Sequence, residues 1–255
     1  MTKIYYFSAT GNTLWSAKRM AEVIGGDCEL VSIGIEAQKE TVIIEADAVV
    51  LLFPSYAYGL PVIVRRFIKG AVFKTPYLAA FVTFGTSPGG SLAAARRILK
   101  KKNINAVYYG KIPSVENFLA LFGPPKEKIT QKRLAMHRES TFTAVRCVLE
   151  RQVNRVFTIR PFSAFVSVLF SLAVKIFYKK YRLSDNCNGC GLCEKVCPVS
   201  AIVMREGRPV FSDKCELCQG CLHWCPLKAI SFGRMNSNCP RYHHPEITIA
   251  DIERV

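Results

Sequence analysis

Short apolar runs alternate with amphipathic stretches along the first part of the chain. This alternation is typical of parallel α/β units, in which a helix follows each buried strand. It predicts a doubly wound five-stranded parallel sheet, whose ligands bind beyond the carboxyl ends of the strands. The expected strands are residues 4–7, 28–32, 48–53, 78–84 and 106–109, and the expected helices are residues 13–24, 61–69 and 91–102.

A different pattern covers the middle of the chain. Residues 126–160 have a helical and strongly basic pattern that ends at Pro161, and residues 162–178 are almost entirely apolar. The uncharged part of this apolar helix, residues 162–174, has 13 residues, which is short of the about 20 that a bilayer requires. We expect it to pack against the first domain or a second protomer of a homo-oligomer. Peripheral membrane contact through its basic flanks stays open.

The formal net charge of +16 is concentrated in this middle segment. Residues 126–182 carry 13 basic and 3 acidic side chains, whereas residues 183–255 carry 8 of each. No nucleic-acid motif and no basic loop interleaved with aromatic residues accompanies the excess, so nucleic acid is not an expected partner. The opening residues predict a strand and not a secretory signal. A cytoplasmic and anaerobic setting is therefore expected.

Eight of the eleven cysteines form two copies of the pattern Cys-x-x-Cys-x-x-Cys-x-x-x-Cys-Pro, offset by 28 residues. This spacing is that of the cysteines that bind iron–sulfur clusters. Zinc sites use pairs of Cys-x-x-Cys with a longer gap, and disulfides need an oxidising compartment, so both are disfavoured. The first run comprises Cys187, Cys190, Cys193 and Cys197, and the second run comprises Cys215, Cys218, Cys221 and Cys225.

Three loops at the carboxyl ends of the expected strands carry candidate ligand-binding residues. They are residues 8–13, 54–61 and 83–90. Hydroxyl and amide groups of the first loop are placed to hold a phosphate at the positive end of the following helix. A plain helix cap at Thr10 or Asn12 is the alternative. Aromatic residues of the other two loops are suited to stack on a flat heterocycle.

The motif Ser8-x-Thr10-Gly11-Asn12-Thr13 after a first strand, with the two further loops, resembles flavodoxin. The whole chain resembles bacterial proteins that join a flavodoxin-like domain to a two-[4Fe-4S] ferredoxin domain. The resemblance implies FMN as cofactor, with Ser8, Thr10, Gly11, Asn12 and Thr13 on its phosphate. The residues implied around its ring are Pro54, Ser55, Tyr56, Ala57, Tyr58, Gly59, Thr83, Phe84, Gly85, Gly89 and Gly90.

In two-cluster ferredoxins the last cysteine of each run binds the other cluster. The resemblance therefore implies one cluster on Cys187, Cys190, Cys193 and Cys225, and another on Cys215, Cys218, Cys221 and Cys197. The expected fold is a flavodoxin-like five-stranded parallel sheet, a helical linker and a small α+β ferredoxin domain. The expected organisation is an FMN-binding domain over residues 1–112, a basic helical linker over 113–182, the ferredoxin domain over 183–235 and a tail over 236–255.

Together these features predict an electron-transfer protein that links FMN, two [4Fe-4S] clusters and an external redox partner, a ferredoxin or a reductase. The alternative is an FMN-dependent reductase of a quinone or another unsaturated compound. The flavin loops contain no obvious general acid or base, which favours the carrier, although Tyr56 and Tyr58 keep the enzyme open. Cys239 is expected to be a free thiol, since the tail offers only His243 and His244 beside it.

Overall fold

The computed structural model describes residues 1–102, 104, 107–119, 123, 126–155, 166, 169–170, 176–233 and 239–252. Its centre is a parallel sheet of five strands in the order β2-β1-β4-β6-β7. Counted along the chain, this order is 2-1-3-4-5, which is that of flavodoxin-like doubly wound folds. The expected fold class is confirmed. The strands are β1 (Thr2–Tyr6), β2 (Cys28–Ser32), β4 (Ala48–Pro54), β6 (Leu78–Phe84) and β7 (Val107–Pro113).

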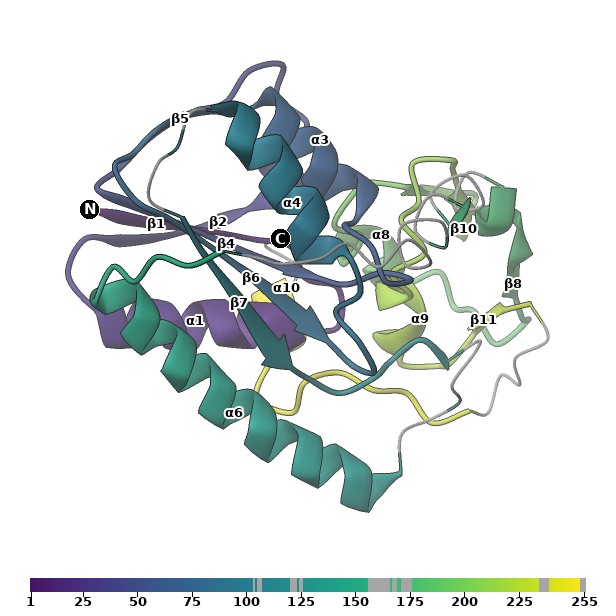
Figure 1. Ribbon diagram of the computed structural model, residues 1–255. Helices are drawn as coiled ribbons and strands as arrows, with labels where there is room; N and C mark the ends of the chain where they lie inside the picture. The colour runs from purple at the N-terminus through teal and green to yellow at the C-terminus, as the bar shows by residue number, and fades with distance from the viewer. Residues whose placement is uncertain are drawn as a thin grey trace.

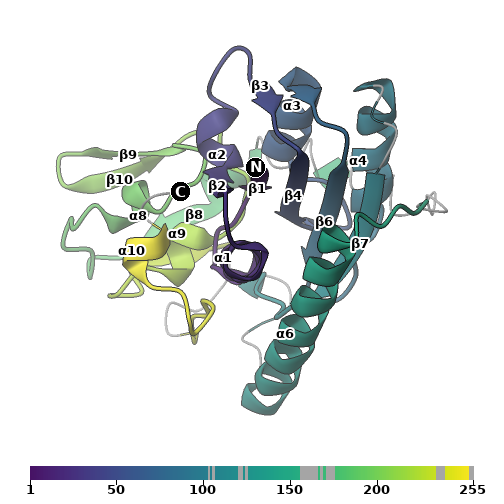
Figure 2. The ribbon, with the colours of Figure 1, turned by 90° about the vertical axis from the view of Figure 1, so that its left-hand side faces the viewer.

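Helices cover both faces of this sheet (Figures 1 and 2). One face packs against α1 (Asn12–Ile24) and α6 (Glu127–Leu149), and the other against α3 (Val62–Gly70) and α4 (Ser91–Leu99). Alternate residues of a strand serve the two faces: Ile4 packs with the α1 side and Tyr5 with the α3 side. Because both faces are covered, the central strands β4 and β6 are nearly continuous apolar runs, and the sequence pattern locates them well.

Short elements at one end of the sheet were absent from the sequence expectations. Helix α2 (Ile33–Glu36) follows β2, and β3 (Ile43–Glu45) pairs with β5 (Val72–Lys74) in a parallel two-stranded ribbon. These elements have four or three residues each, which is too few for a helical or alternating pattern to be recognised. Helix α4 continues into a 3₁₀ turn, η1 (Lys100–Lys102), within the expected helix 91–102.

The two cysteine runs belong to a smaller α+β unit beside the sheet (Figure 1). Strand β8 (Tyr181–Leu183) pairs antiparallel with β11 (Ile230–Phe232), and β9 (Ile202–Arg205) pairs antiparallel with β10 (Arg208–Phe211). Each run contains one short helix, α8 (Leu192–Lys195) or α9 (Gly220–His223). The repeat of the sequence is therefore a structural repeat. A 3₁₀ turn, η2 (Tyr178–Lys180), leads into β8.

The smaller unit and the sheet share a hydrophobic core. Leu217, Leu222 and Phe232 are buried in the same cluster as the residues of the sheet that face α3 and α4. Trp224 is buried in the cluster on the opposite face, next to α1. A shared core of this kind resists independent movement of the two parts, because separating them would expose apolar surface to water.

The middle segment divides into a part that is described and a part that is not. The helical stretch expected to run to residue 160 ends at Leu149, and Asn154 beyond it bonds to β7. This helix, α6, was expected in the linker, but it packs against α1 and β7 and completes one helical layer of the sheet. Most of the expected apolar helix at 162–178 lies outside the described residues. Of the described ones, Phe170 and Tyr178 pack against the core that the sheet shares with the smaller unit, and the partner of the rest stays a prediction. Within the part of the chain that the structure describes, no helix has the length and apolar character to cross a membrane.

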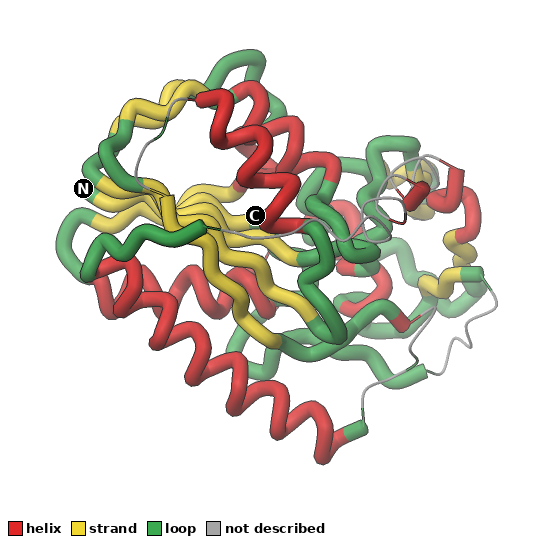
Figure 3. Tube along the Cα trace, in the orientation of Figure 1, coloured by secondary structure: helices red, strands yellow, loops and turns green. Residues whose placement is uncertain are grey.

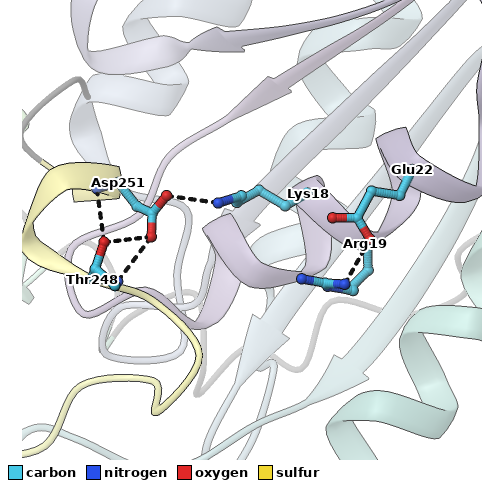
Figure 4. Close-up of polar contacts among 5 residues, drawn as sticks. All are labelled: Lys18, Arg19, Glu22, Thr248 and Asp251. Carbon is cyan, nitrogen blue, oxygen red and sulfur yellow. Dashed lines mark hydrogen bonds and ion pairs between the residues drawn. The ribbon is translucent and has the colours of Figure 1, made fainter.

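The C-terminal tail lies against the α1 side of the sheet (Figure 2), and Figure 3 marks the C-terminal end of the chain. Ile247 and Ile252 are buried there, the latter in the short helix α10 (Ile249–Ile252). An ion pair of 2.6 Å joins Lys18 Nζ on α1 to Asp251 Oδ1 on α10, and Asp251 also accepts hydrogen bonds from Thr248 (Figure 4). The tail is thus a structural part of the flavodoxin-like half.

A buried histidine between α1 and α6 predicts a pH dependence of stability. Ser16 Oγ lies 2.7 Å from His137 Nε2, and Trp15 and His244 stack nearby. Burial, and then the neighbouring His244, lowers the pKa of His137 from 6.5 to about 3. The folded state therefore binds fewer protons than the unfolded state between these values. Stability is fully present above the unfolded pKa and is lost as the pH falls toward the folded pKa.

We expect His137 to reduce the free energy of unfolding by about 2 kcal/mol between pH 7 and pH 5, at 1.36 kcal/mol per pKa unit. Urea unfolding of the wild type and of His137→Leu at both pH values measures this. The variant is expected to be less stable at about pH 7 but to lose less on acidification. Equal losses in the two proteins would contradict the assignment.

Candidate cofactor sites

A cavity of about 680 Å³ opens at the carboxyl ends of the sheet strands. Four loops line it, following β1, β4, β6 and β7, as expected for a ligand site in a doubly wound fold. Residues of the apolar segment, among them Leu169, Phe170 and Phe177, also line it. Twelve of the sixteen residues that the resemblance implied for FMN line this cavity. They are Ser8, Thr10, Asn12, Thr13, Pro54, Ser55, Tyr56, Ala57, Tyr58, Thr83, Phe84 and Gly85.

The other four implied residues do not line the cavity, and each has a structural neighbour instead. A Cβ atom added to Gly11 would contact Ile247, and one added to Gly89 would contact the backbone of Tyr58. Gly59 exchanges two hydrogen bonds of 2.9 Å with Tyr56, and Gly90 N donates to Tyr58 O at 2.8 Å. A contact of any of these four glycines with FMN stays a prediction.

The first loop leads into the amino-terminal end of α1. Gly11 precedes the helix with φ +93°, and the backbone N–H groups of the first turn follow it. Such an end attracts a phosphate through its free N–H groups and its dipole. Thr10 Oγ1 accepts a hydrogen bond of 2.5 Å from Asn117 Nδ2, and Thr13 Oγ1 lies 2.7 Å from Thr83 Oγ1. Gly11 occupies the N-cap position of α1 and no side chain caps the helix, so the alternative of a helix cap at Thr10 or Asn12 is wrong.

The second loop turns tightly between Tyr56 and Gly59. Its two central residues, Ala57 and Tyr58, have φ values of +44° and +63°. Two positive φ values define a type I′ turn, which usually contains Asn or Gly. Non-glycine residues held in this region store strain, and such strain clusters at ligand-binding sites. The two strained positions directly precede Gly59.

The loop after β7 forms a further wall of the cavity and was missed in the sequence. Ser114, Glu116, Asn117 and Phe118 line the cavity there. Ser114 Oγ is buried without a protein partner, which suits a hydroxyl that binds a polar group of a ligand. The segment carries no glycine motif and no periodic pattern, so only the order of the strands places it at the site.

The second run is enclosed by aromatic residues. Tyr181 stacks on Phe211 at 4.7 Å and meets Phe232 edge-on at 5.0 Å. Burial raises the pKa of Tyr181 well above its ordinary value, and Cys221, Cys215, Cys218 and Cys197 raise it further. These four thiols, three from the second run and one from the first, therefore gather around one tyrosine.

The remaining four cysteines of the two runs line a second, smaller cavity. They are Cys187, Cys190, Cys193 and Cys225. Apolar side chains, among them Leu192 and Ile230, complete its wall, and Cys190 is exposed. The structure thus brings the last cysteine of each run to the group formed by the other run, the arrangement that the resemblance implied.

Both groups are suited to bind iron–sulfur clusters. Burial raises the pKa values of Cys193 and Cys215 to about 11, so these thiols need a positive partner to be thiolates. Backbone N–H groups point at the sulfur atoms, with Ala201 N 3.2 Å from Cys197 Sγ and Ala229 N 3.3 Å from Cys225 Sγ. Hydrogen bonds of this kind tune cluster potentials.

The large cavity also touches the second run. Leu217, Cys218 and Phe232 line it together with the flavin loops. Burial raises the pKa of Tyr56 well above its ordinary value, with Cys218 as the next cause, so this phenol lies beside the thiol. The candidate flavin site and one candidate cluster site therefore share a wall.

The two histidines of the tail stack on different tryptophans. His243 stacks on Trp224 at 4.2 Å, and His244 stacks on Trp15 at 5.0 Å. In the described part of the chain, no three His, Cys, Asp or Glu side chains converge to hold a single metal ion. Cysteines of a cubane cluster each bind a different iron atom and need not converge in this way.

Comparisons with known proteins give one family model and several solved structures. Residues 181–203 match the family model described as a 4Fe-4S binding domain. No curated protein matches the chain. Among solved structures, the Trp repressor binding protein of Bacillus subtilis has 13% identity and a TM-score of 0.35, over 60% of this chain and 99% of that one.

Two further structures have similar values. The flavodoxin of Streptococcus pneumonia TIGR4 has 15% identity and a TM-score of 0.30, over 56% of this chain and 98% of that one. The Flv1 flavodiiron core of Synechocystis sp. PCC6803 has 17% identity and a TM-score of 0.31, over 57% of this chain and 36% of that one. The flavodoxin-like fold itself rests on the strand order of the sheet.

Proposed function

We propose that this chain is an electron-transfer protein that binds FMN in the large cavity and one [4Fe-4S] cluster on each group of four cysteines. The observation that carries the proposal is the shared wall, because Leu217 and Cys218 of the second run line the candidate flavin cavity. FMN, which takes up two electrons, and clusters, which take up one at a time, would together exchange single electrons and pairs. The residues of the chain set the distance between them and exclude water.

An external redox protein is the proposed partner, and the first run is the proposed place of exchange. Cys190 of that run is exposed, whereas Cys215 and Cys221 of the second run are buried. Electron exchange between proteins requires close approach to a cofactor, so the exposed group is the accessible one. A ferredoxin or a reductase fits this role. Peripheral membrane contact and self-association through the apolar segment stay predictions, and the exposed Leu169 and Ile176 belong to that segment.

The alternative function, reduction of a small unsaturated compound, needs a proton donor near the flavin. Glu116 lines the cavity, but its carboxylate accepts hydrogen bonds from Thr86 and from the backbone of Asn117 and Phe118. A carboxylate occupied in this way is a poor proton donor. Rapid exchange of the reduced protein with ferredoxin supports the carrier, and repeated turnover of a quinone would establish the reductase.

Removal of the Thr10 hydroxyl tests the phosphate site. We expect Thr10→Ala to weaken FMN binding about tenfold, because a hydrogen bond to a charged phosphate contributes about 1.5 kcal/mol or more. Titration of the apoprotein with FMN, followed by flavin fluorescence, measures the change. Thr248→Ala, which removes a hydroxyl of the tail, is the matched control. An unaltered affinity in Thr10→Ala would leave Thr10 without a role at the phosphate.

Anaerobic purification tests the proposed function as a whole. Two cubane clusters and one flavin predict about eight iron atoms, eight sulfides and one FMN per chain. The visible spectrum should combine a broad cluster absorbance with flavin bands. Oxygen-free material that stays colourless after reconstitution would overturn the proposal.

A further inference from the structure

The two cysteine runs are alike in their cysteines but differ in what their other side chains do. Four polar or aromatic side chains of the second run bond to backbone atoms outside the smaller unit. They are Glu216, Gln219, His223 and Trp224. The equivalent positions of the first run, 28 residues earlier, hold Asn188, Gly191, Lys195 and Val196, of which Asn188 and Lys195 are exposed.

Glu216 holds the start of helix α3, directly after the second flavin loop. Its carboxylate accepts hydrogen bonds from Val62 N at 3.0 Å and Ile63 N at 2.6 Å, and its exposed fraction is 5%. These N–H groups have no partner within the helix, and an acidic group is favourable at this end. The loop that carries Cys215 and Cys218 is therefore tied to the flavin side of the sheet.

Gln219 and His223 hold the loop after β7. Gln219 Oε1 accepts from Leu119 N at 2.9 Å. Tyr242 N donates to His223 Nδ1 at 3.0 Å, which leaves the proton on Nε2, and Nε2 donates to Asn117 O at 2.8 Å. Asn117 in turn donates to Thr10. One side chain next to two cysteines thus joins the tail, the β7 loop and, through Asn117, the phosphate loop.

Trp224 holds the phosphate loop directly. Its Nε1 donates to Ala9 O at 2.9 Å, and its ring stacks on His243. A side chain on Gly220 would lie 3.2 Å from the same Ala9 oxygen, so the backbones of α9 and the loop are already close. The second run is thus bonded to the loop after β1, to the loop after β7, and to the first residues after the loop that follows β4.

We infer that Glu216, Gln219, His223 and Trp224 are positioning residues that fix the cysteine group around Tyr181 at a set distance from the flavin cavity. The inference rests on the proposed function and adds an order to it: the second-run group is the flavin-side site, and the first-run group is the outer site. Electron transfer slows steeply with distance. Because the cavity loops are bonded to the second run, they move together with its cysteines. The distance between the two sites, and with it the rate of electron transfer, therefore stays the same while the protein fluctuates.

The test compares variants that remove single hydrogen bonds and keep the size of the side chain. Glu216→Gln loses one of two charged acceptors, and Trp224→Phe keeps the ring but loses the donor. The holoprotein carrying both changes is expected to retain its iron and FMN. Electron equilibration between flavin and clusters after a light pulse should slow by a factor of several, because a small increase in distance lowers the transfer rate. Amide exchange at Val62 and Ile63 should accelerate.

Two matched variants keep the test decisive if the double variant loses its clusters. His223→Gln retains a donor for Asn117 O, whereas His223→Leu does not, so equilibration should be faster in the former. Lys195→Gln, at the equivalent position of the first run, should equilibrate as the wild type does. Unchanged equilibration in the double variant and in His223→Leu, with accelerated amide exchange, would overturn the positioning role alone. No equilibration in the wild type would overturn the proposed function.

Discussion

Replacing Cys197 by alanine is expected to remove the iron–sulfur cluster of the second run and to leave that of the first run in place. Cys197 belongs to the first run by sequence, but it lies with Cys215, Cys218 and Cys221 around Tyr181. A cubane that loses one of four thiolates loses its stable coordination. Iron is expected to fall from about eight to about four atoms per chain. The electron paramagnetic resonance signal of one reduced cluster should disappear.

The matched variant is Cys225→Ala, at the same place in the other run. It is expected to remove the cluster of the cavity lined by Cys187, Cys190 and Cys193. The two variants should therefore lose different signals. Cys239→Ala, a cysteine outside both runs, should lose neither. If Cys197→Ala instead removed the signal that Cys190→Ala removes, the grouping of the cysteines would be wrong.

The second large effect is expected from Gly89→Ala, which should abolish stable FMN binding. Gly89 has φ +52°, and an added Cβ would lie 2.3 Å from the Tyr58 carbonyl oxygen and 2.5 Å from its Cα atom. Backbone atoms do not yield as a side-chain end does, so the strained turn at Ala57 and Tyr58 must move. We expect a loss of about 2 kcal/mol or more in the free energy of unfolding.

The control for this prediction is Gly207→Ala in the hairpin between β9 and β10. Gly207 also has a positive φ, +73°, but an added Cβ would meet no atom within 4 Å. It should cost only about 1 kcal/mol for the left-handed backbone and leave FMN in place. Flavin content and Tm of both variants measure the difference. Equal flavin retention in the two proteins would show that the close approach of Gly89 to Tyr58 does not shape the cavity.

The sheet and the cysteine groups are predictable from sequence because each has a strong local pattern. Strand β6 matches its expected range because a buried parallel strand is a continuous apolar run. Strand β2 also matches its expected range, although it lies at the edge of the sheet and is mostly not buried. The thiol at position 197 is placed by a repeat whose spacing is itself a structural rule. In both cases the information lies within a few consecutive residues.

The contacts between the two units are not predictable in this way. Glu216 and Trp224 are ordinary members of the repeat until their partners, 154 and 215 residues away along the chain, are known. An alignment of the two runs with each other would have drawn attention to Glu216 and Trp224. Polar and aromatic residues stand in the second run where glycine, valine or exposed residues stand in the first.

Helix α6 was expected in a linker for a similar reason. Its pattern is strongly basic, and its buried positions mix polar and apolar residues, so composition alone does not place it against the sheet. His137 and Thr141 are buried and lie within hydrogen-bond distance of Ser16 on α1, whereas Ala144, Val145 and Val148 pack in the apolar cluster on that face. A contact surface that is partly polar gives only a weak periodic apolar signal.

The central claim is that the flavin cavity and the second-run cysteines of the same chain share a wall. Flash reduction of the holoprotein, followed by spectra of flavin and clusters over a range of protein concentrations, tests it most directly. We predict that equilibration between them has a rate that does not change with protein concentration. A rate that rises in proportion to concentration would show that electrons pass only between separate molecules, and would contradict the account.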